Sequence, residues 1–152
     1  MPYDSCPTQP HPSGRADTCC VPLESSRLPM RAESARVARR RVRETLELFD
    51  AAPDAIDDAE LLTSELVTNG IVHAGAYGSA LKLYLMRDDQ RLIVEVHDPS
   101  RRVPYLLAEP DDFSESGRGL MIVDKIAADR GVRLTPQGGK VIWFELPAWP
   151  RR

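Results

Sequence analysis

Two stretches of alternating apolar residues, joined by a short polar turn, constrain the fold of this chain more than any other feature. In residues 79–86 and 91–98, every second side chain is apolar over part of the length. A period of two predicts strands with one buried face, and the turn at 87–90 predicts that they form a β-hairpin. The apolar positions are Leu81, Leu83, Leu85, Leu92, Val94 and Val96. One face of this hairpin must therefore pack on another layer.

Two amphipathic helices are predicted before the hairpin, because apolar residues recur there at spacings of three and four. The first begins at Glu33 or Ser34 and ends before Pro53. The second runs from about Asp54, which is a suitable N-cap, to Ala74. The expected apolar positions are Ala35, Ala38, Val42, Leu46 and Phe49 in the first helix, and Ile56, Ala59, Leu62, Leu66 and Val67 in the second.

The region after the hairpin is predicted to contain a third helix and two further strands. A proline-containing, partly acidic loop at 99–116 leads to a helix at 120–129, which Gly131 closes. Strands are expected at 132–135 and 141–146, around a Pro-Gln-Gly-Gly turn. Helices segregated from antiparallel strands predict an α+β fold, a two-layer α/β sandwich.

The N-terminal segment differs in composition from the rest. Residues 1–26 are rich in Pro, Ser, Thr and Cys and have no hydrophobic period, which predicts a disordered or loosely attached leader. The remainder of the 152 residues suits one domain with a core better than two domains. All three cysteines lie in the leader, and an odd number there favours a reducing compartment. A metal site made of Cys6, His11, Cys19 and Cys20 is disfavoured, because adjacent cysteines match no common zinc spacing.

Charge and hydropathy limit the classes of function. A net charge of −3 argues against a general nucleic-acid binder, which is usually basic. No apolar run could span a bilayer and no signal pattern opens the chain, so a cytoplasmic protein without membrane contact is expected. Five arginines between positions 36 and 43 suggest either a partner or nucleic-acid surface, or a solvated helix face; the second interpretation is favoured.

Three polar features suggest a nucleotide site. Glu65 and Asn69 lie one helical turn apart in ELLTSELVTNGIVHAG and so share one side of the second helix. An amide oxygen is a hard ligand suited to Mg²⁺, and a neighbouring carboxylate could orient a hydroxyl or a water for attack on a γ-phosphate. The alternative is that both are ordinary polar helix residues. His73, one turn further on, is interpreted as a capping or packing histidine.

Asp98 ends the second strand of the hairpin. An ionised carboxylate only accepts hydrogen bonds, so it matches the exocyclic amino group of adenine and not the carbonyl of guanine. The alternative is a turn-forming aspartate before Pro99.

A glycine-containing segment precedes the third helix. Gly117 and Gly119 allow the backbone to approach phosphates, and the N–H groups at a helix start attract anions. Arg118 can add a charge-assisted contact. The alternative is a flexible loop that ends at a helix. The segment is neither a Walker loop nor a dinucleotide fingerprint, but its combination with the other two features indicates a site for Mg²⁺ and ATP.

The segments ELVTNGIVHA, VHDPS and GRGLMIVDKIA resemble the N-box and the two glycine boxes of the histidine-kinase-like ATPase superfamily. Within it, the chain most resembles the stand-alone anti-sigma-factor serine/threonine kinases. The resemblance implies an ATP-binding domain at 27–148, with a mixed, mostly antiparallel sheet and helices on one face. It assigns Mg²⁺ coordination to Asn69, the catalytic base to Glu65 and adenine recognition to Asp98. Phosphate contacts are assigned to Gly117, Arg118, Gly119 and Leu120.

The same resemblance implies a function. It predicts an ATP- and Mg²⁺-dependent kinase that binds a sigma factor and phosphorylates a serine or threonine of a small antagonist protein, with no direct contact to nucleic acid. It also suggests a homodimer, with the first helix as a candidate surface. A non-catalytic ATP-sensing module that regulates transcription is the main alternative. A DNA-binding regulator that uses the arginine-rich helix is the least favoured.

Two departures from the family pattern stand out. Gly70 replaces the alanine that usually follows the asparagine and should weaken the helix by about 1 kcal/mol. The segment between Asp98 and Gly117 is too short for a large ATP lid.

Overall fold

The structure is a computed structural model that describes residues 20–74, 80–100 and 122–151. The elements in chain order are strand β1 (Val21–Pro29), helices α1 (Ser34–Leu48) and α2 (Pro53–Ala74), and strands β2 (Ala80–Asp88), β3 (Arg91–Asp98), β4 (Asp129–Leu134) and β5 (Lys140–Pro147). Residues 122–126 are also helical. The α+β class predicted from the sequence is confirmed.

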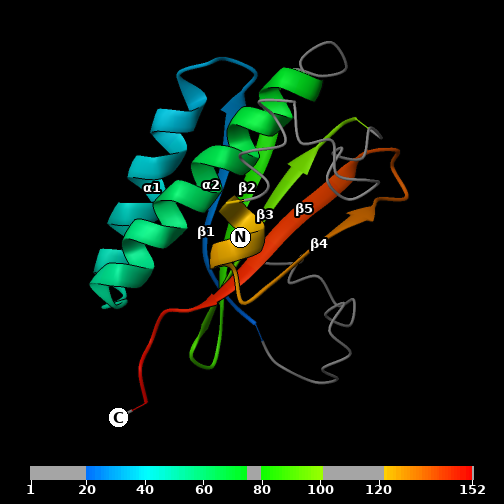
Figure 1. Cartoon of the computed structure of the whole chain (residues 1–152). Helices are drawn as coiled ribbons and strands as arrows, with labels where there is room; N and C mark the ends of the chain where they lie inside the picture. Colours follow the sequence, from blue (N-terminus) through cyan, green and yellow to red (C-terminus); the bar gives the residue numbers. More distant parts are fainter. Residues whose placement is uncertain (1–19, 75–79, 101–121, 152) are drawn as a thin grey trace.

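The strands of the described region form one sheet in the order β1-β2-β3-β5-β4, and all of its pairings there are antiparallel. Helices α1 and α2 lie together on one face of this sheet (Figure 1). The β2–β3 hairpin is tighter than predicted, since Asp88 pairs with Arg91 and leaves only two residues in the turn. Asp89 adopts a φ of 53° there, in the left-handed region that asparagine and aspartate tolerate in turns.

The hydrophobic core lies between the sheet and the two helices. The six alternating residues of the predicted hairpin are all buried, with a relative exposure of 1 % or less. Most of the predicted helix faces are buried against them, although Phe49 at the end of α1 is partly exposed. The fully buried apolar residues of the two helices are Ala38, Val42, Leu46, Ala59, Leu62, Leu66 and Val67. The strand residues with a period of two and the helix residues with a period of 3.6 thus form the two sides of one core.

Strand β1 corrects the predicted extent of the leader. Residues 21–26 were expected to be loose, but they pair with β2 as the first part of an edge strand. Ser26 and Leu28 are its buried side chains, so the strand buries one hydroxyl and one leucine instead of an apolar series. Prolines near both ends, which edge strands tolerate, further hid the strand from pattern analysis. Residues 1–19 of the predicted leader, with Cys6, His11 and Cys19, lie outside the described residues.

Strand β4 corrects the predicted end of the third helix. The helical residues end at 126, and Ala128 N–H already donates to the Glu145 carbonyl of β5 at 2.8 Å. Gly131, expected to terminate the helix, lies within β4 opposite Trp143. A Cβ atom at Gly131 would come within 2.7 Å of the indole ring, so this glycine makes room for a tryptophan.

Helix α2 starts one residue earlier than predicted. Pro53 is its first residue, which suits a side chain whose ring fixes φ near the helical value. Asp54 therefore lies in the first turn and is not the N-cap. Gly70 packs closely on the sheet, because an added Cβ would lie 3.1 Å from a methyl group of Leu81.

Two arginines on the arginine-rich surface of α1 form ion pairs with other elements of the fold. Arg43 donates to Glu60 at 2.6 Å and to Asp57 at 2.7 Å, which ties α1 to α2. The hydrogen bond to Glu60, followed by that to Asp57, raises the pKa of Arg43. Arg41 lies 3.6 Å from Glu24 of β1. These ion pairs fit the interpretation of the arginines as a solvated, structural face.

Among the residues that the structure describes, no helix is both long and apolar enough to cross a membrane.

Strand β1 provides a test of where the domain begins. Leu28→Ala should lower the free energy of unfolding by about 2–5 kcal/mol, because it removes a side chain that is only 1 % exposed. Val21→Ala on the same strand, at a position 53 % exposed, is the matched control and should change it by about 0.5 kcal/mol or less. Urea denaturation of the full chain measures both. Equal stability of the two variants would contradict a structural role for β1.

Candidate functional site

Helix α2 positions the first two candidate residues. It continues without a break from Pro53 to Ala74, and Leu66 and Val67 anchor its C-terminal half in the core. Glu65 is half-buried and Asn69 is 7 % exposed, one turn further along the same side of the helix. The predicted spacing therefore places both polar groups beside the core and away from the fully exposed surface.

The amide oxygen of Asn69 is buried and accepts no hydrogen bond from the residues that the structure describes. Such an atom is uncommon, because leaving a buried acceptor unpaired costs about 1–3 kcal/mol. An amide oxygen that nothing else engages is suited to a hard cation such as Mg²⁺, which also takes ligands from phosphates and water. In the described part of the chain, no group of three or more His, Cys, Asp or Glu side chains could hold a metal. Asn69 thus fits a site in which the nucleotide supplies other ligands.

Glu65 is the second polar group on this side of α2. Within the described ranges, no hydrogen bond or ion pair engages its carboxylate. The carboxylate is therefore able to accept a proton or a hydrogen bond from a group that approaches this side of the helix.

Asp98 and Lys140 form a buried ion pair at the end of β3 and the start of β5. The two residues are register partners, and both side chains are 1 % exposed. Lys140 Nζ lies 2.9 Å from Asp98 Oδ2 and donates to Oδ1 at 3.0 Å. Asp98 Oδ1 also accepts the backbone N–H of Ser100 at 2.8 Å. The carboxylate therefore forms the turn that the alternative interpretation expected, and the ammonium group of Lys140 also holds it.

A glycine allows the two strands to meet so closely. A Cβ atom at Gly139 would lie 2.3 Å from the backbone oxygen of Asp98. The preceding Gly138 has a φ of 97°, which other residues rarely adopt. The Gly-Gly turn thus brings Lys140 to the end of β3. Sequence analysis missed Lys140, and the only signal was a lysine at the start of the otherwise apolar segment KVIWF.

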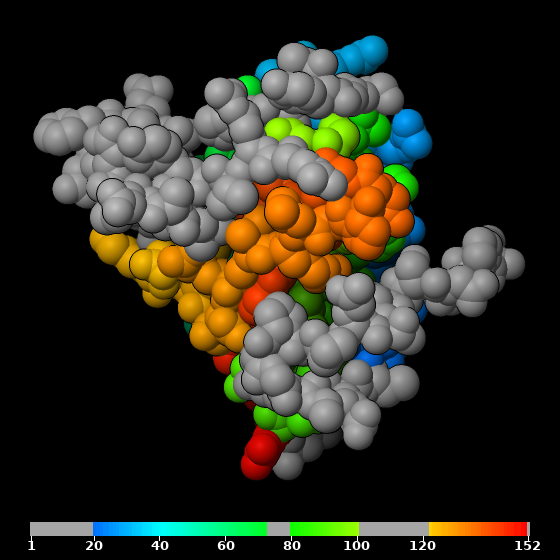
Figure 2. All heavy atoms as spheres, turned by 90° about the vertical axis from the view of Figure 1, so that its right-hand side faces the viewer, coloured from blue at the N-terminus to red at the C-terminus, as the bar shows by residue number. Residues whose placement is uncertain are grey.

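The face of the sheet without α1 and α2 carries a different set of charges. Burial, the largest single influence, raises the pKa of Glu95. The nearby His97 and the hydrogen-bonded Arg133 outweigh burial, so the pKa lies below its ordinary value. Arg133 donates to Glu95 at 2.8 Å and comes from β4, which lies at the surface on this side (Figure 2). Arg91 donates to the buried Glu145 at 2.7 Å. Each of these two carboxylates is paired with an arginine of the fold, and neither forms part of the candidate site.

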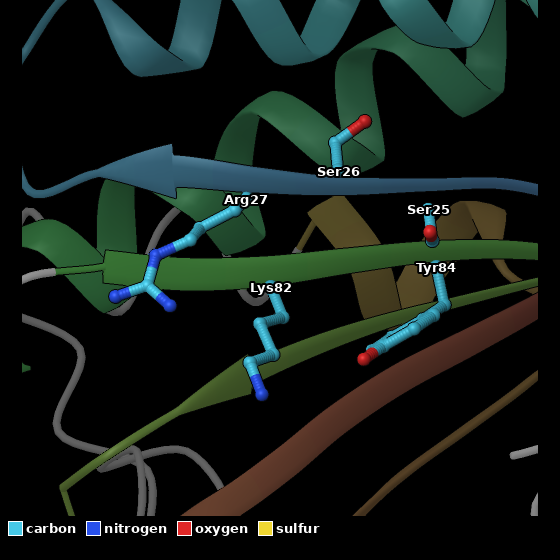
Figure 3. Close-up of a pocket in the computed structure, with 5 residues that line it drawn as sticks. All are labelled: Ser25, Ser26, Arg27, Lys82 and Tyr84. Carbon is cyan, nitrogen blue, oxygen red and sulfur yellow. The ribbon is translucent and has the colours of Figure 1, made fainter. Parts of the chain in front are cut away.

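A shallow pocket lies on strands β1 and β2, away from the candidate site (Figure 3). Ser26 points toward the helices, whereas Lys82 and Tyr84 point away from them. Its lining residues are Ser25, Ser26, Arg27, Lys82 and Tyr84. None of the residues predicted for nucleotide binding lines this pocket.

Gly117, Arg118, Gly119 and Leu120 lie outside the described residues, as does the side chain of His73. The helical residues that follow them, 122–126, contribute Val123 to the core.

Comparison with known proteins identifies a family. The model of the histidine kinase-like ATPase domain matches residues 28–145. No curated protein matches the chain. The crystal structure of the RsbU and RsbW domains of Rv1364c from Mycobacterium tuberculosis is similar, with a TM-score of 0.64 and 19 % identity over 88 % of this chain. This chain spans only 34 % of the mycobacterial one.

A second similar structure is the SiaB–SiaC complex from Pseudomonas aeruginosa. Its TM-score is 0.66 at 13 % identity, and the match covers 82 % of this chain and 89 % of that one. At these identities, both structures show that the fold is shared.

The buried ion pair leads to a stability prediction. Lys140→Met should lower the free energy of unfolding by about 3–5 kcal/mol, because it leaves a buried carboxylate without its counter-charge. The double variant Asp98→Asn/Lys140→Met should recover most of that loss. Lys82→Met, at an exposed position on β2, is the matched control and should change stability by about 0.5 kcal/mol or less. Urea denaturation that ranks Lys140→Met with the control would contradict the burial of a charged pair.

Proposed function

Because this chain belongs to the histidine kinase-like ATPase domain family, we propose that it is an ATP- and Mg²⁺-dependent serine/threonine kinase that acts as an anti-sigma factor. Its substrate is a small antagonist protein. The observation that carries the proposal is the pair on α2. The amide oxygen of Asn69 and the carboxylate of Glu65 lie one turn apart, and neither is engaged by any residue in the described part of the chain.

Each residue has a separate role in this proposal. Asn69 holds Mg²⁺, which neutralises charge on the phosphates when it is bound. Asp98 accepts a hydrogen bond from the amino group of adenine. The phosphate contacts are assigned to the backbone and side chains of Gly117, Arg118, Gly119 and Leu120, because glycines and a helix start suit anions.

Glu65 serves the chemical step. It accepts a hydrogen bond from the serine or threonine hydroxyl of the antagonist and takes its proton as that oxygen bonds to the γ-phosphorus. The bond between the γ-phosphorus and the bridging oxygen breaks, and ADP leaves. The phosphate adds about −1.5 to −2 charges to the antagonist, which would separate it from an interface with acidic or apolar surroundings.

The partners belong to the same proposal. One similar fold was solved in complex with a second protein, SiaC, which supports a protein partner for this chain. A sigma factor as the second partner, a homodimer through α1 and a cytoplasmic location are proposed together with the kinase activity.

A second candidate is a non-catalytic, ATP-sensing module. In this alternative, the buried polar groups Asn69 and Asp98 would serve nucleotide binding and no phosphoryl transfer would follow. Glu65 is the residue that distinguishes the two functions, because only phosphoryl transfer needs a base.

Asn69 provides the test for magnesium. Asn69→Ala should reduce the affinity for ATP in the presence of Mg²⁺ by about tenfold or more, since loss of a contact to a charged group costs about 1.5–3 kcal/mol. Affinity measured in excess chelator should change little. Thr68→Ala, at the exposed neighbouring position, is the control. Isothermal titration calorimetry that finds the same Mg²⁺-dependent gain in the variant would remove Asn69 from the metal site.

Glu65 provides the test for kinase activity. Glu65→Gln should keep the affinity for ATP but lower kcat by at least about a hundredfold, the low end for a general base. KM should change little, because the interaction matters chiefly in the transition state. Glu44→Gln, on the exposed surface of α1, is the matched control.

The assay follows transfer of labelled phosphate from ATP to candidate antagonist proteins, with slow ATP hydrolysis as a second readout. Full activity of Glu65→Gln would exclude this carboxylate from the reaction. A wild-type protein that binds ATP but transfers no phosphate and hydrolyses none would favour the sensing module.

A further inference from the structure

Lys140 is a fully buried lysine that pairs with the buried carboxylate of Asp98. Burial of an ammonium group is costly unless the group is paired and hydrogen-bonded. Replacing a buried ion pair by apolar residues of similar size is often neutral or even stabilising. Stability alone therefore does not explain why a lysine opens β5, where the next four residues are apolar.

The contacts of Lys140 converge on one carboxylate. Its ammonium nitrogen lies within 3.0 Å of both oxygens of Asp98 and donates to the backbone carbonyl of Ser100 at 3.3 Å. The N–H of Ser100 in turn donates to Asp98 Oδ1. The plane and the direction of the carboxylate are thus fixed from β5 and from the turn after β3.

This arrangement also fixes the hydrogen-bonding character of Asp98. An ionised carboxylate offers about four acceptor sites and no donor, whereas a protonated one gains an O–H donor. A buried carboxylate without a counter-charge binds a proton more readily. A protonated Asp98 could donate a hydrogen bond to the carbonyl of guanine. It would also have one acceptor site fewer for the amino group of adenine.

We propose that Lys140 is a positioning residue for nucleotide selection, which holds Asp98 as a fixed, ionised acceptor that prefers an adenine amino group to a guanine carbonyl. The inference rests on the proposed function, since it requires Asp98 to contact the base. Lys140 itself acts through Asp98 and does not touch the nucleotide.

Calorimetric titration of the full chain with ATP and with GTP tests the proposal. The wild type should prefer ATP. Lys140→Met should weaken ATP binding by about tenfold, the equivalent of about 1.4 kcal/mol, and lower the ratio of ATP to GTP affinity by a similar factor. Lys140→Arg keeps the charge and should retain the preference. Lys82→Met removes an exposed lysine from the same sheet and should behave as the wild type.

A double-mutant cycle separates positioning from a general loss of structure. If Lys140 acts through Asp98, then Asp98→Asn and Asp98→Asn/Lys140→Met should bind ATP equally, within about twofold. This comparison decides the question even if Lys140→Met does not fold. A further loss in the double variant, or a wild-type ATP to GTP ratio in Lys140→Met, would overturn the inference. A wild type that binds no ATP would instead overturn the proposed function and this inference with it.

Discussion

The antiparallel pairing of β3 with β5 joins two parts of the chain that are far apart in sequence, and both the core and the candidate site depend on it. Lys140 follows Asp98 by 42 positions, yet the register places them as partners. The same ladder pairs Val94 with Phe144, which are fully buried beneath the helices. One set of backbone hydrogen bonds therefore fixes the core and the surroundings of the candidate base-reading carboxylate together. A shift of one residue would turn every side chain of β5 to the opposite face.

Local patterns predicted the elements that bury a regular apolar face. The hairpin and both long helices follow from side-chain periods of 2 and 3.6, because the side chains that form the core between them are apolar. Apolar periodicity did not predict the elements whose positions depend on contacts across the sheet. Strand β1 buries Ser26 beside Leu28, and Gly131 was interpreted as a helix stop although it accommodates Trp143 across the sheet. Both depend on a neighbour that is distant in the sequence, which no local pattern contains.

The candidate site likewise contains features that the sequence predicted and features that only the structure shows. The spacing of Glu65 and Asn69 predicted that they share a side of α2, and the structure adds that the amide oxygen of Asn69 is buried and unpaired. Asp98 was predicted from its place at a strand end, but its partner Lys140 depends on the register of β5. The match to the family over residues 28–145 gives these positions a common context. Their roles in binding and catalysis stay predictions.

The unpaired amide of Asn69 has an evolutionary consequence. Selection for stability alone would remove it, since an alanine would end the desolvation of a lone acceptor and improve the helix. Natural proteins keep such costly groups where activity requires them. A descendant of this chain that had abandoned its ligand would gain by losing this side chain early, before any change in the surrounding core.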